Sequence, residues 1–312
     1  MANNRMHFKG AIHFITNRCE HEMLLFLPSK RITQIIQGWF ARAFCLFGRG
    51  LEIYAFIFLG NHLHILCRDT AGTLAAFMWY FQSNVARAIN DELGRKGRFF
   101  AREYDDVIVP GDPELIDRYA YIICNAVKAG LVDKSEQWPG WSSLAGALGD
   151  GKYRFEMLNR TKLHNATRRG QQVDKSKFVE VWELQLSVPP ILADMSAAKR
   201  KAYIEKLKES AEAVYRANRG NKPALGVKKI MAQRPLDRPR NPSFRPRTKV
   251  YCHDRAERER WLDGYRRFIG SYREVFDVYR KAAYRKNRPT VSWPEGSYPP
   301  SCWYPVGHSK AA

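Results

Sequence analysis

The chain has 312 residues, of which 45% are hydrophobic and 13% aromatic, so it can form one large domain or two ordinary ones. No run of about 18 uncharged apolar residues is present, which argues against a membrane span. The first residues lack a signal-peptide layout, and six cysteines lie without a CxxC pair, which favours reduced thiols over disulfides or a zinc ribbon. We therefore expect a cytoplasmic protein.

Positive charge is concentrated in the second half of the chain. The formal net charge is +21; residues 1–150 hold 16 Lys and Arg against 15 Asp and Glu, whereas residues 151–312 hold 36 against 16. A basic region of this size suits a polyanion, above all nucleic acid. The alternative is a charged surface that only keeps the protein dissolved. The division predicts a front domain of residues 1–150 and a basic, mainly helical, DNA-binding extension of residues 151–312.

The front domain begins with strand and helix patterns in alternation. Residues 10–18 predict an opening strand, and residues 28–47 predict a helix that starts at a Pro-Ser pair. Residues 51–67 predict either one long strand or a hairpin bent at Gly60-Asn61.

Two helices and a short strand complete this domain. Residues 73–92 carry apolar side chains at helical spacing, and residues 105–109 predict a strand. Asp112 as N-cap and Pro113 in the first turn open a last helix, which continues to Gly130 as C-cap. The order predicts an α+β sandwich of helices against a mostly antiparallel sheet.

The second half has a different pattern. Residues 159–178 are polar and basic and predict a linker, and helices are expected over residues 175–186, 196–218 and 254–286. Residues 234–249 hold four prolines among basic residues. Proline removes a backbone donor and restricts the residue before it, so this stretch predicts an extended basic arm.

Two histidines stand one residue apart in the apolar stretch FIFLGNHLHILCR, residues 56–68. On a strand, residues i and i+2 point to the same face, so His62 and His64 project together. Neutral imidazoles are good metal ligands, and a nearby carboxylate or amide oxygen shifts the preference toward Mn or Mg. The alternative is two satisfied histidines on a polar sheet face.

Tyr121 and Asn125 lie four residues apart, and therefore on one face of the last predicted helix. Asn125 interrupts the apolar sequence IICNAV, and a buried amide without partners costs about 1–3 kcal/mol. It could hold a metal or cap a loop. Tyr121 beside a metal would be a candidate nucleophile toward phosphate; the alternative is an ordinary half-buried tyrosine.

Several other side chains allow either a packing role or a functional one. Tyr119 lies roughly opposite Tyr121 on the helix and is expected to pack. His13 is expected in the core. Gln82 is expected on the polar side of its helix, where contact with DNA or a metal is the functional alternative. Our candidates for DNA binding are Arg98, Arg102, Tyr104, Arg238, Arg240, Arg245 and Arg247.

Aromatic and basic residues alternate over residues 251–285. Aromatic rings stack on unpaired bases and arginines bind phosphates, so this segment predicts contact with a single strand or a hairpin. The alternative is a helical subdomain whose aromatic residues pack inward while its arginines face solvent.

Three blocks of the front domain resemble a known family. GNHLHIL (60–66), GRKGRFFAREYDDVIV (94–109) and YIICNAVKAGLV (121–132) are similar, in order and spacing, to blocks of the single-tyrosine, His-hydrophobic-His (HUH) transposases. The branch they resemble is that of the REP-associated tyrosine transposases, within the IS200-like transposases. Gly60 and Ala126 replace the usual prolines, and Lys128 an arginine. The resemblance covers about residues 6–145.

The resemblance implies a ferredoxin-like domain with a central antiparallel sheet. It implies Mg²⁺ or Mn²⁺ held by His62, His64 and Asn125, and attack by Tyr121 on single-stranded or hairpin DNA, which leaves a 5′-phosphotyrosine and a free 3′-OH. Without its proline, the end of the helix is expected to straighten near Ala126.

Three readings follow for the whole protein. The first is a DNA-nicking and joining enzyme associated with the nucleoid, monomeric or homodimeric. The second is a non-catalytic protein derived from a transposase that binds repeat DNA. The third is an RNA-binding protein with a structural metal, which a preference for the 2′-OH would reveal.

Overall fold

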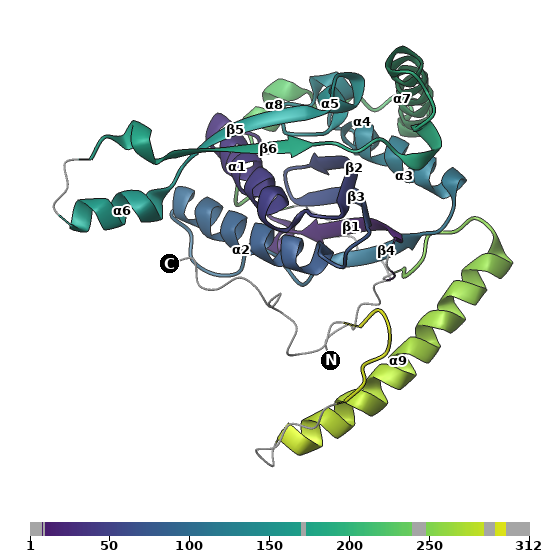
Figure 1. Cartoon of the computed structure of the whole chain (residues 1–312). Helices are drawn as coiled ribbons and strands as arrows, with labels where there is room; N and C mark the ends of the chain where they lie inside the picture. Colours follow the sequence, from purple (N-terminus) through teal and green to yellow (C-terminus); the bar gives the residue numbers. More distant parts are fainter. Residues whose placement is uncertain (1–7, 9, 170–172, 239–247, 284–290, 298–312) are drawn as a thin grey trace.

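The computed structural model describes residues 8, 10–169, 173–238, 248–283 and 291–297 (Figure 1). A four-stranded antiparallel sheet with the order β2-β3-β1-β4 lies at its centre. The strands are β1 (Ile12–Arg18), β2 (Leu51–Phe58), β3 (His62–Asp69) and β4 (Asp105–Val109). With α1 (Lys30–Phe47) and α2 (Leu74–Glu92) between them, they form the βαββαβ order of a ferredoxin-like fold. The predicted α+β class is confirmed.

Strands β2 and β3 form a hairpin, so the alternative of one long strand is excluded. The turn is closed by the Leu59 amide, which donates to the His62 carbonyl at 2.8 Å. A Cβ at Gly60 would lie 3.2 Å from the Leu24 side chain, so the turn packs tightly there. The register places Thr16 opposite His64 and Arg18 opposite His62 on the neighbouring strand β1.

Helices α1 and α2 cover one face of the sheet. Ser29 caps α1 by accepting a hydrogen bond from the Ile32 amide at 3.1 Å, and the helix ends at Phe47 as predicted. The buried side of α2 contains the apolar residues on which the 73–92 prediction rested. Phe40 of α1 packs against Phe81 of α2 and Phe56 of β2, which places the larger core on this face.

The other face of the sheet is covered by α3 (Asp112–Ile123), α4 (Asn125–Lys128) and α7 (Ala197–Arg219). Ile57 and Leu66 of the sheet, Ile122 of α3 and Ile204 of α7 belong to one buried cluster. The sheet is therefore buried between two helical layers (Figure 1). Because successive side chains of β3 point to opposite faces of the sheet, His62 and His64 face the α3 side while Leu63 and Ile65 face the α1 side.

The helix predicted from Asp112 to Gly130 differs in two details. Its N-cap is Gly111, whose carbonyl accepts from the Leu115 amide, so the helix begins one residue earlier than predicted. It is interrupted at Cys124, where φ is −107° and ψ is 13°. The expected straightening near Ala126 is therefore wrong: even without proline the helix breaks, at a buried cysteine whose Sγ donates to the Lys208 carbonyl of α7.

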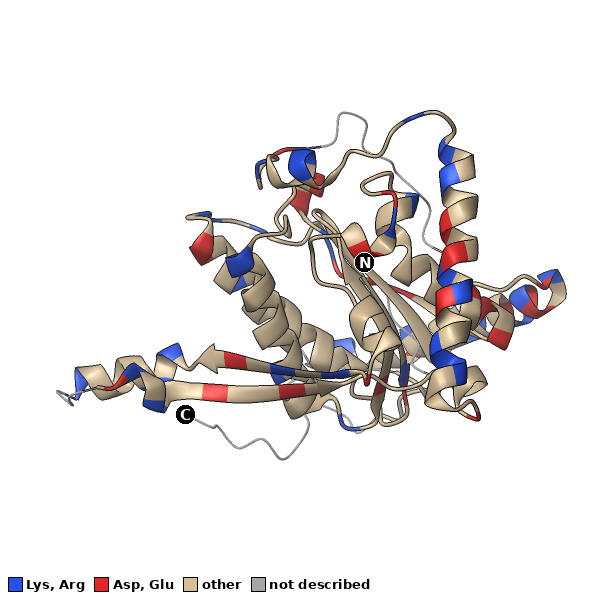
Figure 2. Cartoon of the chain, turned by 90° about the horizontal axis from the view of Figure 1, so that it is seen from above, with Lys and Arg blue, Asp and Glu red and all other residues tan. Residues whose placement is uncertain are grey.

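A two-stranded arm projects from the α1 side of the molecule (Figure 1). It consists of β5 (Lys152–Leu158) and β6 (Val179–Gln185), paired antiparallel, with α6 (Arg160–Arg168) and η3 (Lys175–Phe178) at its far end. Lys and Arg are frequent at this end (Figure 2). The predicted linker over 159–178 and the predicted helix over 175–186 are both wrong.

Helix α7 confirms the helix predicted over residues 196–218, and it is fixed to the front domain by buried polar contacts. Glu212 accepts a hydrogen bond from the Ser135 amide at 2.7 Å, and Lys208 forms an ion pair with Glu136. The remaining short elements are η1 (Glu20–Glu22), η2 (Ser135–Gln137), α5 (Leu144–Leu148), η4 (Pro190–Leu192) and α8 (Val227–Met231). The division at residue 150 stays a prediction.

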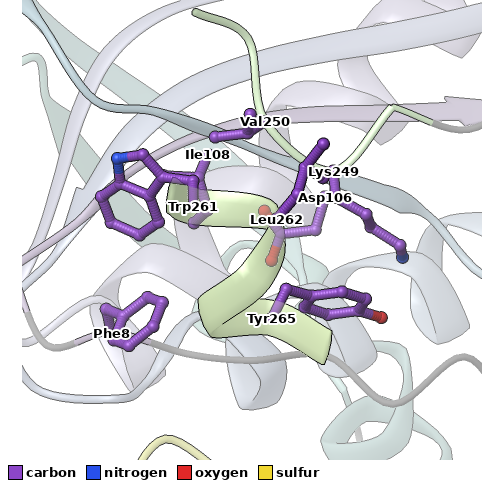
Figure 3. A pocket seen from close by; sticks show the side chains of 8 residues that line it. All are labelled: Phe8, Asp106, Ile108, Lys249, Val250, Trp261, Leu262 and Tyr265. Atoms are coloured by element: carbon purple, nitrogen blue, oxygen red, sulfur yellow. The ribbon is translucent and has the colours of Figure 1, made fainter. Parts of the chain in front are cut away.

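Helix α9 (Arg255–Ala283) confirms the helix predicted over 254–286 within the described residues. It begins beside β4, where Ile108, Val250 and Trp261 pack together (Figure 3), and then extends away from the sheet (Figure 1). Along it, Tyr272 packs against neighbouring rings, namely those of Phe268, Phe276 and Trp293. These contacts favour the alternative in which the aromatic residues pack inward. No helix in the described ranges is long and apolar enough to cross a membrane.

Candidate active site

The two histidines of β3 lie side by side beneath α3. Their ring centroids are 4.9 Å apart and their planes are nearly perpendicular, at 81°. His64 is buried and stacks on Phe14 of β1 at 5.1 Å, whereas His62 is half-buried at the start of the strand. The prediction that both rings share one face is confirmed.

One ring nitrogen of each histidine is engaged by a neighbouring side chain. The Nδ1–H of His62 donates to the Asn61 amide oxygen at 2.6 Å, and His64 Nδ1 lies 2.8 Å from the Thr16 hydroxyl. The Nε2 of His64 is buried and has no hydrogen-bond partner within the described part of the chain. A buried polar atom normally has a hydrogen-bond partner, so a bound ligand could supply the partner that this nitrogen lacks.

Both histidines are held in the neutral form. Burial, assisted by the Arg18 guanidinium, lowers the pKa of His62 to about 4. Burial and then neighbouring positive charges, including that of Arg118, place the pKa of His64 well below its usual value. Neutral imidazoles can bind a metal without first losing a proton.

Tyr121 approaches the histidines from α3. Its ring centroid is 5.3 Å from that of His64 in an edge-to-face contact, and Phe14 contacts it from the same side of the sheet. Two cations flank the ring: the Lys128 Nζ at 4.1 Å and the Arg118 guanidinium at 4.8 Å from its centroid. The fold thus brings together the two imidazoles of β3, the phenol and the guanidinium of α3, and the Lys128 ammonium of α4.

Asn125 is the first residue of α4, directly after the break at Cys124, and only 4% of its surface is exposed. The hydrogen bonds and ring contacts found within the described residues do not join it to either histidine. The same residues contain no cluster of three or more His, Cys, Asp or Glu side chains suited to a metal. The third ligand therefore stays a prediction.

The predicted DNA-binding residues lie in different surroundings. Arg98 and Arg102 are exposed, and Arg102 pairs with Asp105 at 2.8 Å. Tyr104 is 6% exposed and belongs to the core on the α2 side, so its ring is not a surface for stacking bases. Arg238 is exposed; three further candidates lie outside the described residues, namely Arg240, Arg245 and Arg247.

The positions of three further side chains in the fold test what was expected of them. Tyr119 of α3 is buried in the apolar cluster between α3 and the sheet, which confirms its packing role. His13 is buried and its Nδ1 lies 2.9 Å from Asp106, which confirms a core histidine. Gln82 belongs to α2, on the opposite face of the sheet from His62 and His64, so it does not reach the histidine pair.

Three residues of this site were missed from the sequence. Thr16 stands far from the histidines in the chain, and only the β1–β3 register brings it to His64. Arg118 carried a usable signal, because it lies three residues before Tyr121 and so on the same helix face. Tyr251, whose ring covers the Arg118 guanidinium at 3.7 Å, is separated from it by more than a hundred residues and gave none.

Neither a family model nor a curated protein matches the chain. Among solved structures, one similar chain is a REP-associated tyrosine transposase bound to a REP hairpin: the identity is 18%, the match covers 48% of this chain and 87% of that one, and the TM-score is 0.40. Another comes from Deinococcus radiodurans R1 and is provisionally described as a transposase, with 12% identity, 34% and 85% coverage and a TM-score of 0.27. Both similarities are partial and of low identity.

Proposed function

We propose that this protein is a metal-dependent single-stranded DNA nuclease and strand transferase in which Tyr121 is the nucleophile. The observation that carries the proposal is the meeting of Tyr121 with His64 and His62, from segments more than fifty residues apart. They meet around the buried Nε2 of His64, which has no hydrogen-bond partner among the residues that the structure describes. The family resemblance of the same residues supports it.

The histidine pair is suited to a divalent cation. When the Nδ1–H of His62 donates to Asn61 and the Nδ1–H of His64 donates to Thr16, the lone pair of each Nε2 remains available for a ligand. Mg²⁺ or Mn²⁺ bound by these nitrogens, with Asn125 as a third ligand, would polarise a phosphodiester oxygen and stabilise the charge that develops on it.

The Tyr121 oxygen would form a bond to phosphorus and lose its proton to solvent. The bond between phosphorus and the 3′ oxygen would break, and that oxygen would leave as a 3′-OH after taking up a proton. The 5′-phosphate stays on Tyr121, which conserves the ester for attack by another 3′-OH and therefore allows strand transfer. Lys128, stacked on the phenol ring, supplies positive charge where the anionic phosphate arrives.

Substrate selection is the part we assign to the basic second half. Its net charge of +20 over residues 151–312 would attract the backbone of a DNA hairpin, so that the strand at the foot of the stem enters the front domain. We therefore propose hairpin or palindromic DNA as the substrate.

The test is a covalent adduct. Single-stranded oligonucleotides with hairpins from the flanks of the gene are incubated with the protein, with and without Mn²⁺, and resolved on a denaturing gel. We expect a metal-dependent protein–DNA band that is lost in Tyr121→Phe and kept in Tyr119→Phe, a matched control that removes the same hydroxyl two residues away. Hairpin binding without an adduct under any metal would leave a non-catalytic binding protein.

A further inference from the structure

Arg118 is held beside the proposed nucleophile by residues of the second half of the chain. It lies three residues before Tyr121 on α3. Its guanidinium carbon is 3.7 Å from the ring centroid of Tyr251 and 4.8 Å from that of Tyr121. Phe14 contributes a third ring at 5.4 Å. Guanidinium groups stack favourably on aromatic faces, so these rings fix where the charge lies.

The acidic neighbours of Arg118 on α3 are engaged by other groups. Glu114 accepts a hydrogen bond from the His253 amide at 2.7 Å. Asp117 accepts one from the Tyr251 hydroxyl at 3.2 Å and lies 2.9 Å from His253 Nε2. Glu114 lies one turn before Arg118 on the same helix face, and Asp117 directly precedes Arg118 in the chain. Residues of the second half of the chain engage both carboxylates.

Arg118 therefore keeps a positive charge that no carboxylate of the described residues neutralises. Among the ion pairs formed by the described residues none includes Arg118, and its Nε is buried without a hydrogen-bond partner there. A half-buried guanidinium of this kind favours an anion that can accept several N–H bonds at once, and the phosphodiester is such an anion.

The segment that carries Tyr251 is fixed to the sheet. The Ile108 amide donates to the Lys249 carbonyl at 3.0 Å, and the Tyr251 amide donates to the Ile108 carbonyl at 2.8 Å. Val250 packs with Ile108 and with Trp261 of α9 (Figure 3). Tyr251 is therefore anchored on β4, and its contact with Arg118 follows from that pairing.

We propose that Arg118 binds a backbone phosphate of the DNA strand next to Tyr121, and that Tyr251 and His253 are positioning residues that keep its guanidinium available. The inference rests on the proposed function, because it takes the strand at Tyr121 to be DNA. The second half of the chain would then contribute directly to the site as well as to hairpin binding.

The test measures binding without chemistry. Affinity for a labelled single-stranded hairpin oligonucleotide is measured without metal in a Tyr121→Phe background, as a function of salt. Adding Arg118→Gln is expected to weaken binding about tenfold and to lower the salt slope by about 0.7, the share of one phosphate on a single strand. Arg118→Lys should keep part of the affinity. The matched control is Arg49→Gln. Arg49 is an exposed arginine just before the start of β2, and the other end of that strand leads into the turn before His62.

A scan with uncharged methylphosphonate linkages identifies the phosphate. One linkage is expected to weaken binding about tenfold in the parent protein and to have no further effect in Arg118→Gln, the coupling expected of a direct contact. Tyr251→Leu should reduce this coupling, and Tyr251→Phe should preserve more of it because the ring remains. A merely structural role would weaken every oligonucleotide equally, without such coupling.

Two results would overturn the inference: an unchanged salt slope in Arg118→Gln, or methylphosphonate effects that are the same with and without Arg118. Failure of the proposed function gives a different result, because the adduct at Tyr121 would be absent while the coupling at Arg118 persisted. Circular dichroism of each variant establishes that it is folded before its affinity is compared.

Discussion

Thr16 is the residue that fixes the orientation of the buried histidine at the site. Its hydroxyl is hydrogen-bonded to His64 Nδ1 at 2.8 Å, so Nε2 is the atom that would bind the proposed metal. Partners of this kind typically change metal affinity by about 10–100-fold. We expect Thr16→Val to weaken Mn²⁺ binding about tenfold in calorimetric titrations of the DNA-free protein, and His64→Ala to abolish it. His13→Asn, which alters a histidine on the other face, should bind Mn²⁺ as the parent does; equal affinity in Thr16→Val would contradict the assignment.

A pH dependence of stability is expected from His13 and Asp106. Burial lowers the pKa of His13, but the charge of Asp106 and its hydrogen bond outweigh burial, so the pKa in the folded protein is raised above 6.5. The pair therefore stabilises the fold fully below about pH 6.5, and this stabilisation is lost as pH rises through the folded pKa.

Urea denaturation between pH 5.5 and 9 checks this expectation. The parent should lose more stability than His13→Asn as the pH rises, because the variant has no proton to lose at this position. Parallel curves for the two proteins would show that the pair contributes nothing.

Much of the site could be predicted at the scale of residues. The spacing of His62 and His64 predicts a shared face on any strand, and the spacing of Tyr121 and Asn125 predicts one helix face. That the phenol meets the imidazoles is a tertiary fact. Thr16 and Tyr251 could not be predicted, because the strand register of β1 and the pairing of residue 250 with β4 bring them in.

At the scale of elements, Gly130 ends α4 in the left-handed region, with φ at +68°. An added Cβ would find ordinary space, 3.6 Å from Arg219, so the backbone conformation alone sets the cost. Gly130→Ala is expected to lower the free energy of unfolding by about 1–2 kcal/mol.

Gly264 offers a control of opposite sign. It lies inside α9 with open space around its Cα, and alanine is favoured over glycine in a helix interior by about 1 kcal/mol. Gly264→Ala should therefore increase helicity. A Gly130→Ala protein as stable as the parent in urea would show that the turn can relax.

Helices were predicted better than the arm. The apolar side of α2 repeats with the period of a helix, whereas β6 alternates, with exposed Val179 and Val181 on one face and Trp182 and Leu184 on the other. This period-2 pattern of β-branched residues was available in the sequence. A linker over residues 159–178 leaves such a strand without a partner, which is why the prediction for this segment is a helix.

At the scale of the whole molecule, the basic second half is partly built into the fold. Leu184 and Leu192 are buried in the clusters on the two faces of the sheet, so this half cannot be removed without exposing the core. Helix α9 differs, because it leaves the sheet (Figure 1) and carries exposed Lys and Arg residues (Figure 2).

Salt dependence tests whether α9 binds the DNA backbone. Three arginines of α9 are exposed, namely Arg260, Arg267 and Arg273. Each phosphate contact on a single strand contributes about 0.7 to the slope of log affinity against log salt. Replacing all three by glutamine is expected to lower the slope by up to about 2 in fluorescence anisotropy.

The matched control removes the same charge from the front domain. Lys30, Arg49 and Arg87 are exposed there, and their triple replacement by glutamine should leave the slope nearly unchanged. If both triple variants lose the same slope, the attraction comes from net charge alone, and α9 has no special part in it.

The central claim is that Tyr121 forms a bond to DNA, and the most direct measurement identifies the modified residue. The covalent product is digested with protease and nuclease, and the nucleotidyl-peptide is sequenced by mass spectrometry. Our account predicts a phosphodiester on Tyr121 in the peptide that follows Arg118, formed only with Mn²⁺ or Mg²⁺. A nucleotide on Tyr251 or Tyr215, or no modified peptide from protein that binds the hairpin, would contradict it.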